Sequence, residues 1–227
     1  MFGMKFQEGE FVRVKTGDND RGHGGELGIV IQINPNPVTG VVIDVPIDQI
    51  DMRDAESYVV GFPPNDTARE RGYFAEEQLE AVKVFISHDP KDFSLAEKVA
   101  SVLQEAGFKD VWDYRRILPG DNWAEKTSQA LKESIAMVVL LTPDSLESSI
   151  VSWDIGFALG EESYQERLIP VIAGNPEQMP EEKIPWILRR LKLIMLPEQG
   201  RDAESLKQIA LAVKEVALKE VALKEVA

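Results

Sequence analysis

The sequence predicts an α/β fold for most of the chain, a parallel sheet of five strands with helices on both faces, preceded by a small all-β domain. From residue 81 onward, short apolar runs alternate with segments of helical periodicity, which is typical of a parallel sheet covered by helices. Before residue 81, several short strands lie between turn-rich segments, with no convincing helix before Glu76. We therefore expect an all-β domain at 1–80, an α/β domain at 81–215 and a helical C-terminal extension at 216–227.

The expected strands of the first domain are residues 11–15, 27–33 and 41–45, joined by segments rich in glycine, asparagine and proline. The glycines at 22–28 lack the Gly-Lys-Ser/Thr ending and the following helix of a phosphate-binding loop, so we interpret them as a hairpin loop. The order Gly-Glu-Phe-Val-Arg-Val, Gly-Ile-Val-Ile and Tyr-Phe-Ala-Glu-Glu-Gln-Leu-Glu resembles SH3-like β-barrels, in which a closing Phe and Leu pack back on the core. The resemblance favours a domain for protein interaction or substrate sensing.

The first strand of the second domain is expected at 82–89, a short apolar run that ends in a polar tip. Asp89 can cap the following helix, Pro90 suits its first turn, and Asp92 places a carboxylate near the positive helix end. The domain boundary is therefore expected just upstream of Val82.

The remaining elements continue the same alternation. Gly107 is expected to end the first helix, Asn122 to cap the second, and Pro119-Gly120 to form the centre of a type II turn. The most apolar strand, 136–142, is expected at the centre of the sheet. The expected order is a strand at 110–114, a loop at 115–122, a helix from 123, a strand at 136–142, a helix at 146–160, a strand at 168–172, a helix at 181–192, a strand at 193–196 and a helix from 203.

Composition excludes several classes of function. The formal charge of −14 disfavours nucleic acid and anionic membranes, so we expect neither as a partner. The absence of cysteine excludes disulfides, thiolate metal sites and a cysteine nucleophile, and two histidines are too few for a typical zinc site, so no metal is expected. The chain has no run of about 18 apolar residues and no N-terminal signal segment, which predicts a cytoplasmic protein.

Several motifs in the second domain, in the correct order, resemble a TIR (Toll/interleukin-1 receptor) domain of the bacterial type. The resemblance spans residues 82–215 and implies a flavodoxin-like TIR sheet. The motifs are Phe85-Ile-Ser-His88, Asp92, Ala106-Gly-Phe-Lys-Asp-Val-Trp112, Leu118-Pro-Gly-Asp-Asn-Trp123, Ala130-Leu131, Val138-Val-Leu-Leu141, Ser145 and Ser148-Ser-Ile-Val-Ser-Trp-Asp-Ile-Gly-Phe-Ala158.

The resemblance implies a candidate activity. Many TIR domains of this type are NAD⁺ nucleosidases (glycohydrolases or cyclases) that cleave the nicotinamide–ribose bond, with NAD⁺ as the substrate and without a cofactor. In antiviral defence this cleavage either depletes NAD⁺ or produces a second messenger. The leaving of nicotinamide through an oxocarbenium-like state needs positioning, an aromatic clamp and one carboxylate near the ribose.

The family's catalytic glutamate and its aromatic partner align with Asp154 and Ile150. Aspartate keeps the charge but is one methylene shorter, and a displacement of about 1 Å at a reacting centre can cost on the order of a hundredfold in rate. Ile150 cannot stack on a ring, and Trp153, about one helical turn further on, either offers a substitute surface or packs on the sheet. By position, the resemblance also assigns nucleotide contacts to Phe85, Ser87, His88, Arg115, Asp121 and Trp123.

A non-catalytic scaffold is the alternative function. TIR domains also assemble head to tail through the loop at 115–122. The family's glutamate and its aromatic partner, a tryptophan, are replaced here by Asp154 and Ile150, and their loss fits a scaffold role. The resemblance therefore implies self-association through the TIR domain, with other TIR-containing or sensor proteins as further partners in signal transduction.

The C-terminal tail repeats the unit Lys-Glu-Val-Ala-Leu from residue 214. A five-residue period advances about 500° per unit, so the valines of successive units spread around the helix. We expect a solvent-exposed helical extension and not a coiled-coil seam.

Overall fold

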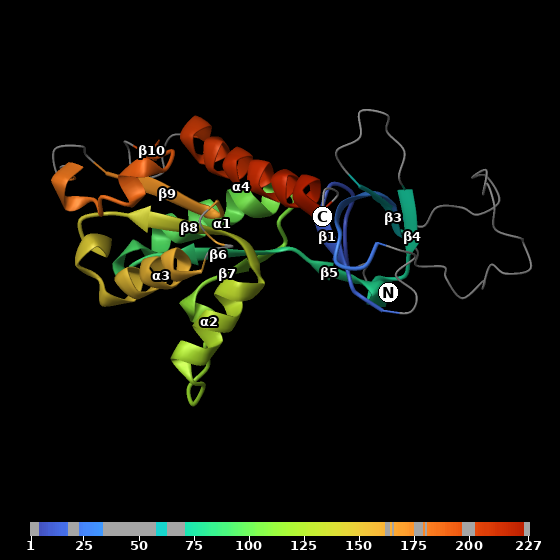
Figure 1. Ribbon diagram of the computed structural model, residues 1–227, viewed down its shortest axis with the longest axis horizontal. Coiled ribbons are helices and arrows are strands. Elements are labelled where there is room, and N and C mark those ends of the chain that lie inside the picture. The colour runs from blue at the N-terminus through green and yellow to red at the C-terminus, as the bar shows by residue number, and fades with distance from the viewer. Residues whose placement is uncertain are drawn as a thin grey trace, which may run out of the picture. The chain divides into compact units, whose positions relative to one another are not determined.

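The computed structural model describes residues 5–17, 23–33, 58–62, 71–161, 164, 166–174, 179, 181–196 and 203–224 (Figure 1). The chain divides into two compact units, one of residues Met1–Val82 with Glu220–Ala227 and one of residues Lys83–Lys219. Each unit is described by itself.

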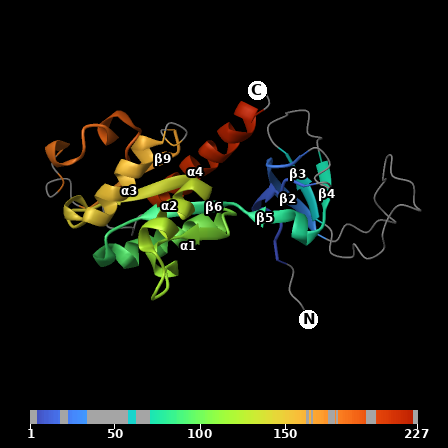
Figure 2. The same cartoon turned by 60° about the horizontal axis from the view of Figure 1, so that its bottom comes forward.

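The first unit contains a five-stranded antiparallel sheet with the strand order β4-β3-β2-β1-β5 (Figure 2). Two predicted strands are present with nearly the expected bounds, and the strand expected at 41–45 lies outside the described residues. Phe74 and Leu79, the expected closing pair, are buried in the core of this unit. The strands are β1 (Phe11–Val14), β2 (Leu27–Ile33), β3 (Tyr58–Gly61), β4 (Arg71–Phe74) and β5 (Leu79–Ala81).

The second unit contains a parallel sheet of five strands with the order β10-β9-β8-β6-β7. The central strand is β8, as its apolar sequence predicts, and it is buried along its whole length. The strands are β6 (Lys83–Ser87), β7 (Asp110–Trp112), β8 (Ser134–Leu141), β9 (Leu168–Ala173) and β10 (Ile194–Leu196), and the helices are α1 (Phe93–Glu105), α2 (Trp123–Glu133), α3 (Ser149–Gly160) and α4 (Ala203–Lys224).

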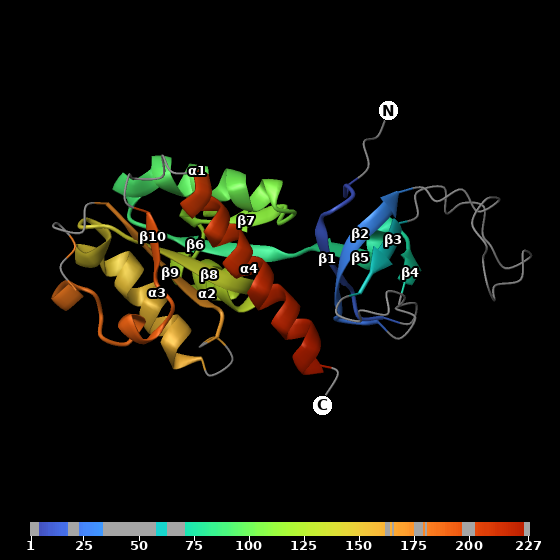
Figure 3. The same cartoon turned by 90° about the horizontal axis from the view of Figure 1, so that it is seen from above.

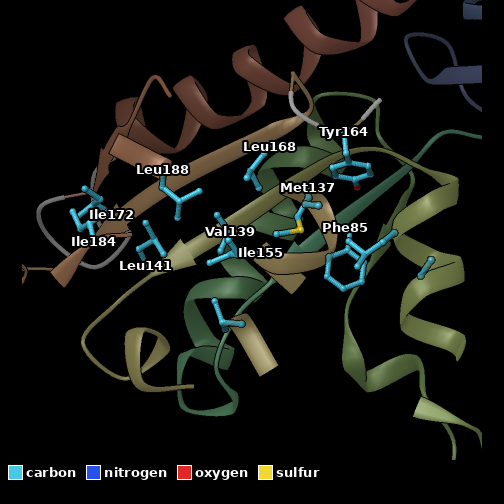
Figure 4. Packing of buried hydrophobic residues seen from close by; sticks show 14 of the residues in the cluster. Phe85, Met137, Val139, Leu141, Ile155, Tyr164, Leu168, Ile172, Ile184 and Leu188 are labelled. Carbon is cyan, nitrogen blue, oxygen red and sulfur yellow. The ribbon is translucent and has the colours of Figure 1, made fainter. Parts of the chain in front are cut away.

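Helices cover both faces of this sheet. Met137, Val139 and Leu141 of β8 share one apolar cluster with buried residues of α2 and α3, including Ile155 (Figure 4). Because successive side chains of a strand point to opposite faces, the alternate residues of β8 face the other layer. Figure 3 shows α4 crossing the sheet, and α4 and α1 each bury an apolar stripe.

Three expected elements need correction. The strand expected at 110–114 ends at Trp112, because the Asp113 side chain accepts from the backbone N–H of Arg115 and caps a 3₁₀ turn at Tyr114–Arg116. The helix expected at 181–192 is two short 3₁₀ turns, Glu181–Lys183 and Leu188–Arg190. Pro185 lies between them, and a proline inside a helix removes one hydrogen bond and disfavours helical geometry at the preceding residue.

The third correction concerns the C-terminal extension. The helix runs without a break from Ala203 to Lys224, so the tail is the continuation of α4 within the described residues. Ala217, inside the repeat, is buried four residues after Val213, and the prediction of an exposed extension is wrong at this position. Small side chains at a four-residue spacing share one helix face, so the repeat prolongs the buried stripe.

Candidate functional site

The carboxyl ends of β6, β7 and β8 bring together the polar segments that follow them. In open parallel sheets this edge is where ligands bind. Ser87 ends β6 and His88 follows it, Asp113 and Tyr114 follow β7, and Asp154 is on the buried side of α3. The site thus contains the predicted residues Ser87, His88 and Asp154 together with Tyr114.

Asp154 is at the centre of this group, with none of its surface exposed. Its Oδ2 atom accepts a hydrogen bond of 2.6 Å from Ser87 Oγ and another from the hydroxyl of Tyr114. Its Oδ1 atom has no hydrogen-bond partner among the described residues. The carboxylate is therefore fixed on one oxygen only, in surroundings that disfavour its charge.

Burial raises the pKa of Asp154 from 3.8 to about 7. The hydrogen bond from Ser87 and the charge of His88 favour the ionised form, but the two together do not offset the burial. Near neutral pH the protonated and ionised forms of the side chain are therefore both populated. This places its titration in the range where general acid–base catalysts act.

A second buried hydroxyl lies near the carboxylate. Tyr164 is buried, its OH finds no partner among the described side chains, and it belongs to the same core cluster as Phe85 and Met137 (Figure 4). Burial, together with the charge of Asp154, raises the pKa of Tyr164. The sequence predicts a role for neither Tyr114 nor Tyr164. No local signal predicts that the hydroxyl of Tyr114, 40 residues away in the chain, donates to Asp154.

An ion-pair network holds the segment that carries Tyr114. The Arg115 guanidinium donates to both carboxylate oxygens of the buried Asp113 and lies over the Phe93 ring at 4.2 Å. His88 Nε2 is 3.8 Å from Asp113 Oδ2, and His88 Nδ1 lies 2.8 Å from the carbonyl oxygen of Asp89. Burial opposes charge at both His88 and Asp113. The contact with Asp113 and the carbonyl oxygen of Asp89 nevertheless raise the pKa of His88, against the opposing charge of Arg115. Contacts with His88 and Arg115 hold the pKa of Asp113 far below its usual value.

A row of aromatic rings leads from this site along α2 and α3. Tyr114 and Trp123 stack with centroids 6.1 Å apart, Trp123 and Trp153 are 5.2 Å apart, and Trp153 stacks on Phe157 at 5.6 Å. Trp153 is 36% exposed and lies between the rings of Trp123 and Phe157. Ile150 is half-buried on the preceding turn of α3.

The other predicted site residues have more local roles. Phe85 is fully buried and stacks on Trp112 at 5.0 Å, so its side chain is part of the core. Asp121 stabilises its own loop, in which its Oδ2 accepts from the N–H of Leu118 at 3.0 Å. Gly120 has φ +98° and the Asp121 N–H donates to the Leu118 carbonyl oxygen, as the predicted type II turn requires.

The described residues contain neither a candidate metal-binding group nor a helix that could span a membrane. No group of three histidine, cysteine or carboxylate side chains there is placed to hold a metal ion. No described helix is long and apolar enough to cross a bilayer.

The chain is similar to known proteins in family and in fold. A family model described as "TIR domain" matches residues 84–210, which is more than half of the chain. A metazoan TIR-STING receptor from C. gigas, solved in complex with 2',3'-cGAMP, is 24% identical with a TM-score of 0.48, and the match covers 57% of this chain and 38% of that one. The TIR domain of the Toll-related receptor TRR-2 from Hydra magnipapillata is 20% identical with a TM-score of 0.45, covering 59% of this chain and 96% of that domain. No curated protein matches.

Proposed function

Because the protein belongs to the TIR domain family through residues 84–210, we propose that it is a signalling or defence protein that cleaves the nicotinamide–ribose bond of NAD⁺ when assembled. Asp154 is the ribose-facing carboxylate in this proposal. The observation that carries it is a carboxyl group at the carboxyl edge of the sheet whose pKa is about 7 and whose two donors come from different strand ends.

The reaction breaks the bond between ribose C1′ and the pyridinium nitrogen. The bonding electron pair leaves with nicotinamide, which becomes neutral, and positive charge develops on the ribose. Water then attacks C1′ and loses a proton, or a hydroxyl or ring nitrogen of the same nucleotide attacks and cyclises it. An ionised Asp154 beside the ribose would stabilise the charged state.

Asp154 in its present setting cannot reach a substrate, since it is wholly buried and held by Ser87 and Tyr114. Tyr114 begins the 3₁₀ turn at the base of the loop 115–122, the segment through which TIR domains self-associate. A movement of this loop would withdraw the Tyr114 hydroxyl and open one side of the carboxylate. We therefore expect slow turnover by the isolated chain and faster turnover after assembly.

The remaining predicted contacts complete this proposed site. Trp153 is the exposed ring of the aromatic row, beside Trp123 at 5.2 Å, and a nucleotide ring would stack there in place of the aromatic side chain that Ile150 lacks. Ser87, His88, Arg115 and Asp121 stay proposed contacts by their positions at the same edge.

A non-catalytic scaffold is the second candidate, and the burial of Asp154 is the observation that favours it. A scaffold needs no carboxylate that a substrate can reach, and its function does not depend on an aromatic residue at the position of Ile150. We further propose that the antiparallel sheet of the first unit is an SH3-like barrel that binds a protein or a small signal and reports it to the TIR domain.

The test is nicotinamide release from NAD⁺ at increasing protein concentration, with products separated. Tyr114→Phe removes one hydrogen bond to the carboxylate and keeps the ring on Trp123. A hydrogen bond to a charged group is worth about 1.5–3 kcal/mol, so the open population, and with it turnover by the dilute chain, should rise at least about tenfold.

Asp154→Asn is the matched control, because the amide oxygen still accepts from both hydroxyls but cannot carry charge. This variant should release no nicotinamide. Asp154→Glu and Ile150→Trp together should restore the family's pair and raise turnover further. If none of these chains consumes NAD⁺ under conditions where the wild type assembles, the enzymatic proposal is wrong and the scaffold stands.

A further inference from the structure

The segment 183–196 differs in charge from the rest of the molecule. It contains four basic residues and no acidic residue, whereas the whole chain carries −14, so the other residues together carry −18. All four basic side chains are exposed. They are Lys183, Arg189, Arg190 and Lys192.

An exposed tryptophan lies within this segment. Trp186 is 62% exposed, more than any of the other three tryptophans, and the guanidinium of Arg190 lies 5.5 Å from its ring centroid. This separation is within the range of a cation–π interaction. The side chain thus presents a broad apolar face to solvent beside a cation.

The backbone under Trp186 is well anchored. Ile184, two residues before it, and Leu188, two residues after it, are buried in the core cluster of the α/β unit. Trp186 is therefore held in position by its neighbours without taking part in the core itself. Pre-organisation of this kind lowers the entropy that a binding residue loses when a partner docks.

We propose that Lys183, Trp186, Arg189, Arg190 and Lys192 form a self-association surface, called here the basic tryptophan surface, which docks on an acidic face of a second copy of the chain. Tryptophan and arginine are the residue types most enriched where binding energy concentrates. Charge complementarity identifies the occupant, because the remainder of every copy carries −18 and so offers an acidic partner at the same concentration.

Other occupants fit less well. A nucleic acid is negatively charged along its whole length, whereas a second copy of the chain also carries basic side chains that can face the acidic residues around the docked surface. The loop 115–122 of a second copy carries Arg115 and Arg116, which would repel the basic tryptophan surface. The contact is thus between two different faces, and such heterologous contacts lead to rings or open filaments.

This inference deepens the assembly step of the proposed function, and its test uses no NAD⁺. Sedimentation velocity on the full chain at rising concentration should show self-association that weakens between about 0.1 M and about 0.5 M salt, since screening reduces ionic attraction. Trp186→Ala should raise the dissociation constant by at least about tenfold, the effect of losing an anchor residue. Arg190→Glu should raise it by a similar factor.

Two matched variants serve as controls. Leu211→Ala truncates a side chain on α4 that is 61% exposed, close to the value for Trp186. Lys98→Glu reverses an exposed charge on α1. Both controls should associate like the wild type. A wild type that stays monomeric at every concentration, or a Trp186→Ala variant that associates no more weakly than Leu211→Ala, would overturn the proposal. Because association is read without substrate, an inactive but associating chain would contradict only the catalytic proposal.

Discussion

Replacing Asp154 by asparagine should make the α/β unit more stable at alkaline pH. The pKa of Asp154 in the folded chain is about 7, against an ordinary value of 3.8. Between these two values the folded state holds a proton that the unfolded state has released. The free energy of unfolding therefore falls as the pH rises toward 7, and it is level with respect to this group above that pH.

The size of the effect follows from this shift. One pKa unit corresponds to about 1.4 kcal/mol, so ionisation of Asp154 should lower the free energy of unfolding by about 2–3 kcal/mol between about pH 5 and about pH 8. Asparagine does not ionise, and its side-chain oxygen can accept from Ser87 and Tyr114. The advantage of Asp154→Asn over the wild type should thus be larger at pH 8 than at pH 5 by about that amount.

Urea denaturation followed by tryptophan fluorescence measures this difference in the relevant unit. All four tryptophans lie between Lys83 and Lys219, so their emission reports the α/β unit alone. Glu105→Gln, at an exposed side chain at the end of α1, is the control, and its effect on stability should be the same at the two pH values. An advantage of Asp154→Asn that is equal at the two pH values, or a loss of stability at pH 8, would refute the reasoning.

Three further predictions concern caps, packing and activity. Asn122→Ala removes the side-chain acceptor of the Glu125 N–H at the start of α2, and should cost about 1 kcal/mol in urea unfolding, whereas Asn122→Ser should recover most of it. Gly28→Ala would place a Cβ 2.2 Å from Val60 Cγ1, so it should destabilise the antiparallel sheet by about 1–3 kcal/mol. Because all tryptophans lie in the α/β unit, an unfolding transition in tryptophan fluorescence that equals that of the wild type would show that the two units unfold separately. If Asp154 acts as a carboxylate, nicotinamide release by the wild-type chain should rise with pH through about 7, and a rate that falls over this range would contradict that role.

Local signals in the sequence predicted much of the fold correctly. Asn122 caps α2 as expected, Gly107 ends α1 with φ +102°, and Gly120 takes the positive φ of the type II turn. Asp89 caps the short 3₁₀ turn Pro90–Asp92 that precedes α1, and not α1 itself. Each of these depends on a few neighbouring residues. The run of apolar residues in β8 likewise identified the centre of the sheet, because only a strand buried on both faces has such a sequence.

The incorrect element predictions arose where a second local signal outweighed the first. The missed site contacts depend on tertiary structure. Helical periodicity at 181–192 was outweighed by Pro185, and the strand expected to include Tyr114 was ended by the cap from Asp113. The family pattern led to Asp154, but no local signal indicates that Ser87 and Tyr114 donate to it or that it is buried. Those contacts join residues 67 and 40 positions apart, so they follow from the sheet order and not from sequence spacing.

A titration of the Asp154 carboxyl carbon by ¹³C NMR, assigned by comparison with Asp154→Asn, tests the description of this site most directly. It reports the protonation of the one group on which both the proposed chemistry and the predicted pH dependence rest. The structure predicts a midpoint near 7, because burial outweighs the hydrogen bond from Ser87 and the charge of His88. A midpoint close to the ordinary aspartate value of about 4 would contradict it, since the carboxylate would then be hydrated and fully charged at neutral pH.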